Sequence, residues 1–203
     1  MDLRKKKESS GNAEDIEQEY GRTWIWTAID APSRLLITFW IGGRELIDAR
    51  QMLQNLASRS QAKPLFVSDE LPHYATVHKT RESGRVVQVD RRVVYGSEQS
   101  VRDRLADSPS HKINTAYIER SNLNWRLWDA HLVRKSLTFA RSLRWLRAKF
   151  AIVVSCYNLI RPHGTLSRGA DRVFRPTTPA MAADVTDHLW TFGELLAYPA
   201  TCQ

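Results

Sequence analysis

Two apolar segments near the N-terminus are separated by a turn and predict a β-hairpin. Residues 23–30 and 35–41 are rich in β-branched and aromatic side chains, and the turn signal Ala-Pro-Ser-Arg at 31–34 lies between them. This spacing predicts a hairpin with a four-residue loop. Because both strands are apolar nearly throughout, we expect other elements to cover both faces, as in an α/β layer structure.

The pattern then changes to helical spacing. Residues 45–58 carry apolar side chains three and four apart, which predicts a helix, and residues 64–68 form a short apolar run that predicts a buried strand. A helix and then a strand after a hairpin predict a parallel crossover onto the hairpin sheet. Weaker signals predict a short helix, two further strands and a surface loop, at residues 73–79, 86–90, 91–95 and 96–113 respectively.

The C-terminal half is predicted to be helical from about Thr115. An apolar stripe predicts a long, largely buried helix over residues 136–159, which Arg-Pro-His-Gly at 161–164 ends. A proline-led helix is expected within residues 176–183, and a last apolar segment at 190–198. The expected organisation is a charged tail or loop (1–22), a core (23–175) and a C-terminal helical extension docked on it (176–203).

The charge of the chain favours an anionic partner. Its net charge is +8 and its pI is about 9.8, which favours nucleic acid first, although a solvated basic protein such as a ribosomal accessory factor has the same balance. Cys156 and Cys202 fit neither a disulfide framework nor a zinc site, so a reducing cytoplasm is the expected location. No apolar run is long enough to span a bilayer, and we expect no membrane association.

Three acids lie where the end of a strand or helix would expose them: Asp30, Asp69 and Glu119. Carboxylates gathered from distant segments are what metal-assisted phosphodiester chemistry requires, with Mg²⁺ or Mn²⁺ as the metal. Each acid also has a simpler interpretation. Asp30 is suited to begin the turn before Pro32. Asp69 follows an apolar strand at its carboxyl end, and Glu119 is an acid in a first helical turn, where the helix dipole favours it.

The order of these elements, together with several short motifs, resembles a known family. The motifs are Trp-Ile-Trp-Thr-Ala-Ile-Asp (24–30), Val-Ser-Asp (67–69), Tyr-Ile-Glu-Arg-Ser-Asn-Leu (117–123), Arg-Lys-Ser-Leu-Thr-Phe (134–139), Tyr-Asn (157–158) and Arg-Pro-His (161–163). They resemble the DDE transposases of bacterial insertion sequences, of the insertion-sequence-one type. A cellular ribonuclease-H-like nuclease such as a junction resolvase fits the order of elements but not the Arg-Lys-Ser-Leu block.

The resemblance implies an α/β, ribonuclease-H-like mixed sheet with flanking helices. It implies that Asp69 and Glu119 are the second and third catalytic acids and hold Mg²⁺ or Mn²⁺. The implied reaction is strand cleavage at the ends of an insertion sequence, followed by strand transfer into target DNA. DNA is then the partner, and a homo-oligomer is expected because such transposases commonly work as multimers.

The front of the chain departs from this family pattern. The first acid normally lies in an Asp-Glu-hydrophobic-Trp strand before residues 24–30, whereas this chain opens Met-Asp-Leu-Arg-Lys-Lys-Lys. The sheet is therefore expected to lack its first strand. Either Asp30 replaces the first acid, or the chain is a truncated, non-catalytic DNA-binding remnant of such a transposase.

A dense group of cations follows Glu119 and is predicted to contact DNA phosphates. The candidate DNA-binding residues are Arg120, Arg126, Arg134, Lys135, Arg141, Arg161 and His163. The simpler interpretation is that individual cations only solvate the outer face of a helix. The seven tryptophans are expected to be mostly core residues, although Trp125 or Trp128 could stack on an unpaired base.

Overall fold

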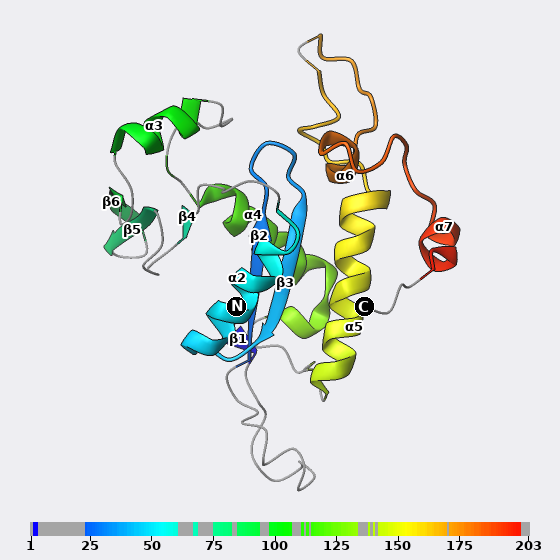
Figure 1. The fold of residues 1–203 in the computed structure, drawn as a ribbon, viewed down its shortest axis with the longest axis horizontal. Helices are drawn as coiled ribbons and strands as arrows, with labels where there is room; N and C mark the ends of the chain where they lie inside the picture. The colour runs from blue at the N-terminus through cyan, green and yellow to red at the C-terminus, as the bar shows by residue number, and fades with distance from the viewer. Residues whose placement is uncertain are drawn as a thin grey trace, which may run out of the picture.

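The computed structural model shows an α/β protein with two three-stranded sheets (Figure 1). It describes residues 2–3, 23–60, 67–68, 75–82, 85–93, 98–106, 111, 113, 115–133, 138, 140, 142–169 and 171–199. The α/β class expected from the sequence is confirmed. The expectation of one mixed sheet is wrong, because β4 joins a second sheet rather than the hairpin sheet.

The predicted hairpin is the centre of the first sheet. Strands β2 (Thr23–Ile29) and β3 (Leu36–Gly42) are antiparallel, and the loop between them is longer than the four residues expected. The ladder shifts between Ala28 and Ile29, so that Ile29 lies opposite Leu36. Ile37 is therefore an extra residue in β3, without a partner in the ladder. Because side chains alternate along a strand, this extra residue places Leu36 on the same face as Ile25 and Ile41.

A two-residue strand completes this sheet. Strand β1 (Asp2–Leu3) pairs antiparallel with β2, with Asp2 opposite Trp24. These two residues were expected to belong to a charged tail or loop and to leave the sheet without its first strand. The hairpin sheet instead has a short third strand beside β2.

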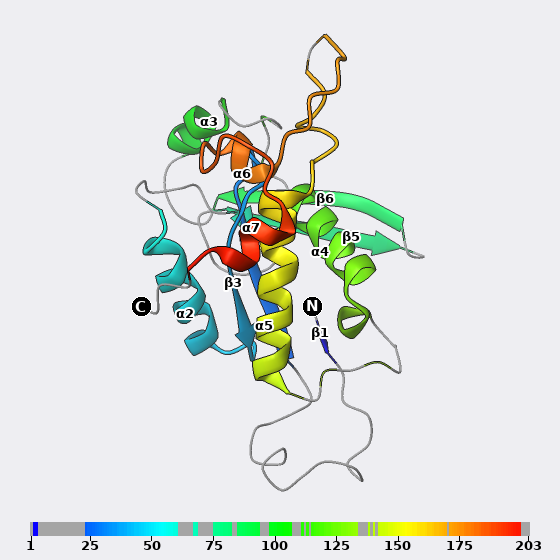
Figure 2. The same cartoon turned by 90° about the vertical axis from the view of Figure 1, so that its right-hand side faces the viewer.

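Helix α2 (Leu46–Ala57) lies within the predicted range and covers one face of the hairpin, as Figure 2 shows. Asp48 attaches the helix to β3, because its Oδ1 accepts a hydrogen bond of 2.8 Å from Trp40 Nε1. Gly42 permits this approach. A Cβ at this position would collide with the Asp48 carboxylate and would lie 2.7 Å from Trp40 Nε1.

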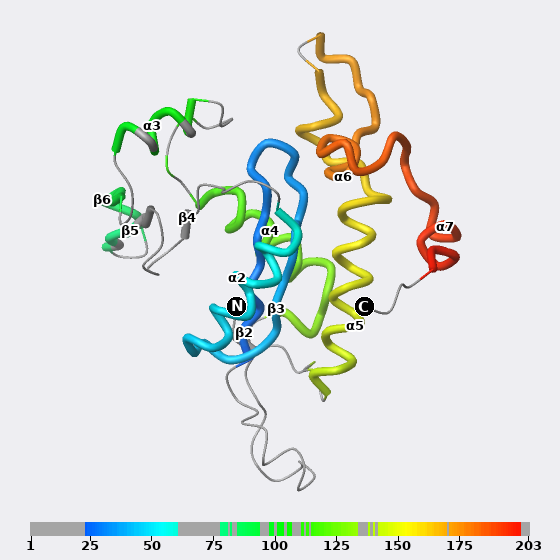
Figure 3. The backbone as a smooth tube through the Cα atoms, viewed as in Figure 1, coloured from blue at the N-terminus to red at the C-terminus, as the bar shows by residue number. Residues whose placement is uncertain are grey.

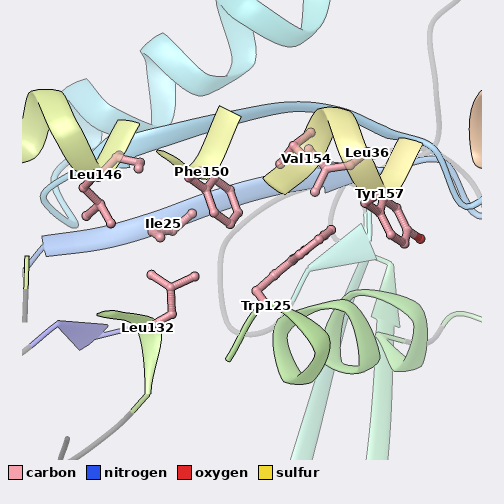
Figure 4. Close-up of a cluster of buried hydrophobic side chains, with 9 residues drawn as sticks. Ile25, Leu36, Trp125, Leu132, Leu146, Phe150, Val154 and Tyr157 are labelled. Carbon is pink, nitrogen blue, oxygen red and sulfur yellow. The ribbon is translucent and has the colours of Figure 1, made fainter. Parts of the chain in front are cut away.

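The main core lies on the opposite face of the hairpin, against α4 (Ala116–Trp128), α5 (Leu143–Ser155) and the π-helical segment η3 (Cys156–Ile160). Figure 4 shows how the buried side chains of this core lie against one another. Trp125 is fully buried and meets Phe150 and Tyr157 edge to face, at centroid distances of 5.7 and 4.9 Å. Edge-to-face aromatic contacts add to the stability that burial supplies, so this group determines where α4 lies relative to α5.

The second sheet corrects three expectations. Strand β4 (Val67–Ser68) pairs in parallel with β5 (Ala75–Glu82), and β5 pairs antiparallel with β6 (Arg85–Val93). Residues 75–79 are therefore strand, where a helix was expected. Over the described residues, the two strands expected at 86–90 and 91–95 form one strand that ends at Val93. Helix α3 (Glu98–Ala106) lies in the expected surface loop. Its buried Val101 contacts a small cluster that includes Val89 and Val93 of β6.

The helical half follows the sequence prediction more closely. Helix α4 begins after Thr115. Helix α5 begins at Leu143, later than the predicted start at residue 136, and Thr138 and Ala140 before it are not helical. Arg161 ends η3, as predicted. Residues 161–178 then leave the core and return to it, as Figure 3 shows, and the backbone N–H of His163 donates to Thr177 O at 2.9 Å.

Two short helices end the described chain. Helix α6 (Pro179–Ala182) has Thr178 as its N-cap and proline in its first turn, as predicted, and contacts η3. Helix α7 (Phe192–Ala197) has no buried residue. The segment before α7 is attached by a hydrogen bond of 3.1 Å from Trp190 N to Leu159 O.

Candidate nucleic-acid interface

Glu119 lies in the first turn of α4, where the sequence predicted it. Its carboxylate accepts a hydrogen bond of 2.7 Å from Thr115 Oγ1, the hydroxyl of the N-cap residue. Its Oε1 is also paired with the ammonium group of Lys79, which β5 supplies. The Glu119 side chain keeps 45% of its surface exposed. The charge of this acid is therefore balanced by a lysine that the sequence did not indicate as a partner.

Asp30 serves the turn of the hairpin. Its Oδ2 accepts hydrogen bonds from the backbone N–H of Ser33 at 2.9 Å and from Ser33 Oγ at 2.5 Å. An aspartate that bonds to the backbone a few residues ahead is a common way to stabilise a turn. The turn interpretation of Asp30 is confirmed, and its proposed use as a replacement catalytic acid gains no support.

The described residues do not assemble a metal site. Among them, no three side chains of the His, Cys, Asp or Glu type lie together so as to hold an ion. Mg²⁺ and Mn²⁺ require several oxygen ligands, and Glu119 is engaged by Lys79. Asp69, the other predicted ligand, lies outside the described residues. Because one of the two predicted ligands lies outside the described residues, the metal that the resemblance implies stays a prediction.

The basic residues Arg34 and His163 both contact the buried Tyr157. Tyr157 donates a hydrogen bond of 2.9 Å to the backbone oxygen of Arg34. It also interacts with Ser121, the residue after Arg120, and its ring lies edge-on to His163 at a centroid distance of 6.3 Å. The hairpin loop, α4 and the segment after η3 therefore meet at the same end of the core.

Arg34 is held in an unusual backbone conformation. Its φ angle is 62°, in the left-handed region that residues other than glycine, asparagine and aspartate rarely adopt. Its guanidinium carbon lies 3.6 Å from the centroid of the Tyr117 ring, and its Nη1 donates to Ala31 O. The turn that Asp30 stabilises and the hydrogen bond from Tyr157 together hold Arg34 in place. Strained residues of this kind often lie at functional sites.

His163 has an electropositive environment. Burial lowers the pKa of its imidazole, and the charges of Arg34 and Arg120 lower that pKa further. Its Nδ1 is buried and has no hydrogen-bond partner among the described residues. The ring therefore favours its neutral form in the free protein, because the charges of the two arginines would repel a charge on the imidazole.

Arg161 stacks on one of the two tryptophans that the sequence offers for base stacking. Its guanidinium carbon lies 4.4 Å from the centroid of the Trp128 ring, and its side chain is exposed. A cation over an aromatic face is held by the quadrupole of the ring. Arg161 thus remains available to an anionic partner, whereas its guanidinium group covers the ring of Trp128.

The other predicted DNA contacts divide into two groups. Arg120 is exposed on α4, whereas Arg126 is half-buried and its Nε is fully enclosed. Arg126 is therefore less suited to a phosphate contact than the sequence suggested. Three predicted contacts lie outside the described residues: Arg134, Lys135 and Arg141.

An ion pair joins the C-cap residue of α4 to the middle of α5. Asp129 is fully buried, and its Oδ1 lies 2.7 Å from Lys149 Nζ and 3.1 Å from His131 Nδ1. Burial raises the pKa of the Asp129 carboxyl, but the hydrogen bonds from Lys149 and His131 outweigh it and hold the pKa below its usual value. This acid therefore stabilises the contact between the end of α4 and α5.

Sequence reasoning missed two residues of this region, Arg34 and Lys79. Arg34 lies in a turn that was interpreted only for its turn chemistry, and nothing in the local pattern indicates a positive φ angle at an arginine. Lys79 lies in a segment predicted to be helical. Its contact with Glu119 joins β5 to α4, two elements that are far apart in the sequence.

Comparisons with known proteins leave the assignment open. No protein-family model matches the chain, and no curated protein or solved structure is similar to it. Over the described residues, none of the helices combines the length and the apolar character needed to cross a membrane.

Proposed function

We propose that this protein is a DNA-binding protein of the transposase type, with a core related to the ribonuclease-H-like transposases of insertion sequences. It contacts the sugar-phosphate backbone through the end of the core where Arg34, Arg120, Arg161 and His163 lie. The observation that carries the proposal is that segments bearing these basic residues meet at Tyr157 and its neighbour Trp128. The backbone oxygen of Arg34 and the ring of His163 contact Tyr157, and the guanidinium group of Arg161 stacks on Trp128.

The charges of this region favour an anionic partner. Repulsion between like charges opposes such a cluster. Burial lowers the pKa of the His163 imidazole, and the charges of Arg34 and Arg120 lower it further. Glu119, the acid next to Arg120 in sequence, is already paired with Lys79. A polyanion relieves the repulsion when it binds, and it releases counterions from its own backbone as it does so. DNA phosphates, which phosphate-contacting arginines bind without regard to base sequence, fit this surface.

Binding to a labelled duplex, measured by fluorescence anisotropy as a function of salt concentration, tests the proposal. The wild-type protein should bind, and its affinity should fall steeply as salt rises. Replacing Arg120 or Arg161 by alanine should lower the affinity and reduce the slope of log K against log[salt] by about 1 for each phosphate that the side chain neutralised. Arg50, exposed on α2, provides the matched control: its replacement by alanine should leave the slope unchanged. Absence of binding by the wild type at low salt would contradict the proposal.

Strand cleavage is a second candidate function, favoured by one observation. Strand β4 ends at Ser68, immediately before Asp69 in the sequence, and Ser68 pairs with Thr76 of the parallel strand β5. Lys79, which binds Glu119, follows three residues later on the same strand, or about 10 Å further along it. The second sheet thus brings the end of β4 into the neighbourhood of Glu119.

A nicking assay separates the two candidates. A supercoiled plasmid that carries the DNA flanking the gene is incubated with the protein and Mg²⁺ or Mn²⁺, and nicked circles are measured on a gel. If the protein cuts, Glu119→Gln and Asp69→Asn should abolish nicking while Asp187→Asn, an exposed acid near the C-terminus, should not. Binding without nicking by the wild type would leave the non-catalytic DNA-binding protein as the function.

A further inference from the structure

Helix α5 carries an apolar stripe on the face that is turned away from the main core. Trp145 keeps 74% of its surface exposed and Ile152 keeps 51%, and the exposed Ala148 lies between them. These residues are three, four and seven positions apart, so they lie on one side of the helix. The buried residues of α5 lie on the opposite side. The α5 stripe (Trp145, Ala148 and Ile152) is therefore open to solvent.

The α5 stripe has a basic border. Arg144 is exposed beside its first residue, and Lys149, whose side chain keeps 44% of its surface exposed, lies on its other side. The sequence of α5 contains three cations and no acid. The carboxylate of Asp129 offsets one of these charges, so the surface stays positive. Its charge complements that of an acidic partner with apolar side chains of its own.

The C-terminal segment 184–199 has the opposite charge and a second apolar face. It contains three acids and no lysine or arginine, so it stays negative even when His188 is protonated. In α7, Phe192 and Leu196 are four positions apart and keep 50% and 70% of their surface exposed. Tyr198, just after the helix, keeps 64% exposed. The segment therefore offers the acidic, apolar surface that the α5 stripe complements.

Both surfaces lie on the same side of the molecule. Figures 1 and 2 place α7 on the side of α5 that is away from the hairpin, which is the side to which the stripe is turned. The hydrogen bond of 3.1 Å from Trp190 N to Leu159 O attaches the segment to η3, whereas α7 itself has no buried residue. Helix α7 is therefore held on this side of the chain without being packed into its core.

We infer that segment 184–199 of one copy of this chain packs on the α5 stripe of a second copy, which returns the same contact. The opposite charges bring the two surfaces together, and their apolar side chains are buried between them. A single contact of this kind is small, because α7 has six residues. Twofold symmetry doubles the buried area, since each copy gives and receives the contact. The inference does not depend on the proposed function, because it requires no nucleic acid.

Sedimentation velocity of the DNA-free protein tests the inference. Over about 1–100 µM, the wild type should show an equilibrium between monomer and dimer. Ile152→Asp and Leu196→Asp should each weaken dimerisation by about tenfold or more, because each places a charge in an apolar contact. Both positions are exposed, so the melting temperature of each variant should stay within about 4 °C of the wild type.

Two residues of α2 provide matched controls. Ile47 and Leu46 are exposed by 68% and 67%, which resembles the exposure of Ile152 and Leu196, but they lie on a different helix. Ile47→Asp and Leu46→Asp should leave dimerisation within about twofold of the wild type. Loss of the dimer in these variants, with Ile152→Asp and Leu196→Asp unaffected, would place the contact on α2 and overturn the inference.

A mixture of Ile152→Asp and Leu196→Asp tests the pairing of unlike surfaces. In either variant alone, both contacts of the dimer contain a substitution. In a mixed dimer, one contact contains both substitutions and the other contains none. The mixture should therefore form more dimer than either variant alone at the same total concentration. Absence of this recovery would mean that the α5 stripe does not pair with segment 184–199, and would overturn the inference.

Three further outcomes would overturn it. The first is a wild type that stays monomeric at every concentration. The second is a dimer that strengthens as salt rises, because salt weakens the attraction between opposite charges. The third is occupation of the stripe by DNA, in which case a monomeric wild type would lose DNA affinity through Ile152→Asp. The proposed function is tested separately, by the salt-dependent binding of the wild type to DNA.

Discussion

Asn158 binds the backbone of Leu36 at two points. Its side-chain oxygen accepts a hydrogen bond of 3.0 Å from Leu36 N, and its side-chain nitrogen donates one of 2.9 Å to Leu36 O. The amide thus copies the pairing that a neighbouring strand would offer to β3. It does so where the hairpin ladder is irregular, and it connects η3 to the hairpin across 122 residues of sequence.

Replacing Asn158 by alanine should therefore destabilise the fold. Two partly buried backbone groups of Leu36 would lose their partner, and each such loss costs about 1 kcal/mol or more. We expect a decrease of about 2 kcal/mol in the free energy of unfolding, measured by urea denaturation. Gln54→Ala, at an exposed position of α2, should change it by less than about 0.5 kcal/mol. Equal effects of the two substitutions would contradict a structural role for the Asn158 amide.

The ion pair between the buried Asp129 and the partly exposed Lys149 should make stability depend on acid pH. The pKa of Asp129 is lower in the folded protein than its ordinary value of 3.8. Its stabilising contribution is therefore present above pH 3.8 and is lost as pH falls through the lower folded value. Asp129→Asn should cost about 1–3 kcal/mol at pH 7. That difference should narrow below pH 3.8, where the wild-type carboxyl also becomes protonated.

Asp171 provides the comparison for this measurement. Its carboxylate is bonded to Arg175 at 2.7 Å, and its pKa is also lowered, first by that contact, but the pair is exposed. Exposed ion pairs contribute little because water and salt screen them. Asp171→Asn should therefore have a much smaller effect at pH 7 than Asp129→Asn. An equal or larger effect would mean that burial does not strengthen the Asp129 pair.

Trp125 and Trp145 should differ strongly in their contribution to the free energy of unfolding. Trp125 has no exposed surface and packs against Phe150 and Tyr157, whereas Trp145 on α5 keeps 74% of its surface exposed. Trp125→Ala should cost about 3–5 kcal/mol or prevent folding, and Trp145→Ala less than about 1 kcal/mol. If Trp125→Ala does not fold, Trp125→Phe can be compared with Trp145→Phe by the same urea titration. A larger cost at position 145 than at 125 would contradict this arrangement of the core.

Tyr157 should make the protein less stable in mild alkali. Burial raises the pKa of its phenol from 10.0 to about 12, although the charge of Arg34 acts in the opposite direction. Between these values the unfolded chain ionises Tyr157 while the folded protein does not, so this residue lowers stability progressively above about pH 10. Tyr157→Phe removes that effect but also removes the hydrogen bond to Arg34, at a cost of about 1–2 kcal/mol near neutral pH. The difference in unfolding free energy between wild type and variant should therefore shrink from about pH 8 to about pH 11.

Local patterns were sufficient where the element is long, apolar and bounded by turn residues. The hairpin, α2, the start of α4 after Thr115 and the proline-led start of α6 all followed from spacing and turn chemistry. Strand β5 did not, because most of its described side chains are polar and its strand form depends on pairing with β6. Helix α3 was missed for a related reason: its few apolar residues become significant only against Val89 and Val93.

The functional region shows the same division. The sequence by itself determined the basic character of the chain, the position of Glu119 in a first helical turn and the use of Asp30 in a turn. Only the tertiary structure decided that Lys79 neutralises Glu119, and that Arg34 and His163 meet at Tyr157. The physical reason is that charge and turn propensity are properties of neighbouring residues. The partners of a charged side chain depend instead on strand pairing and helix packing between segments far apart in the chain.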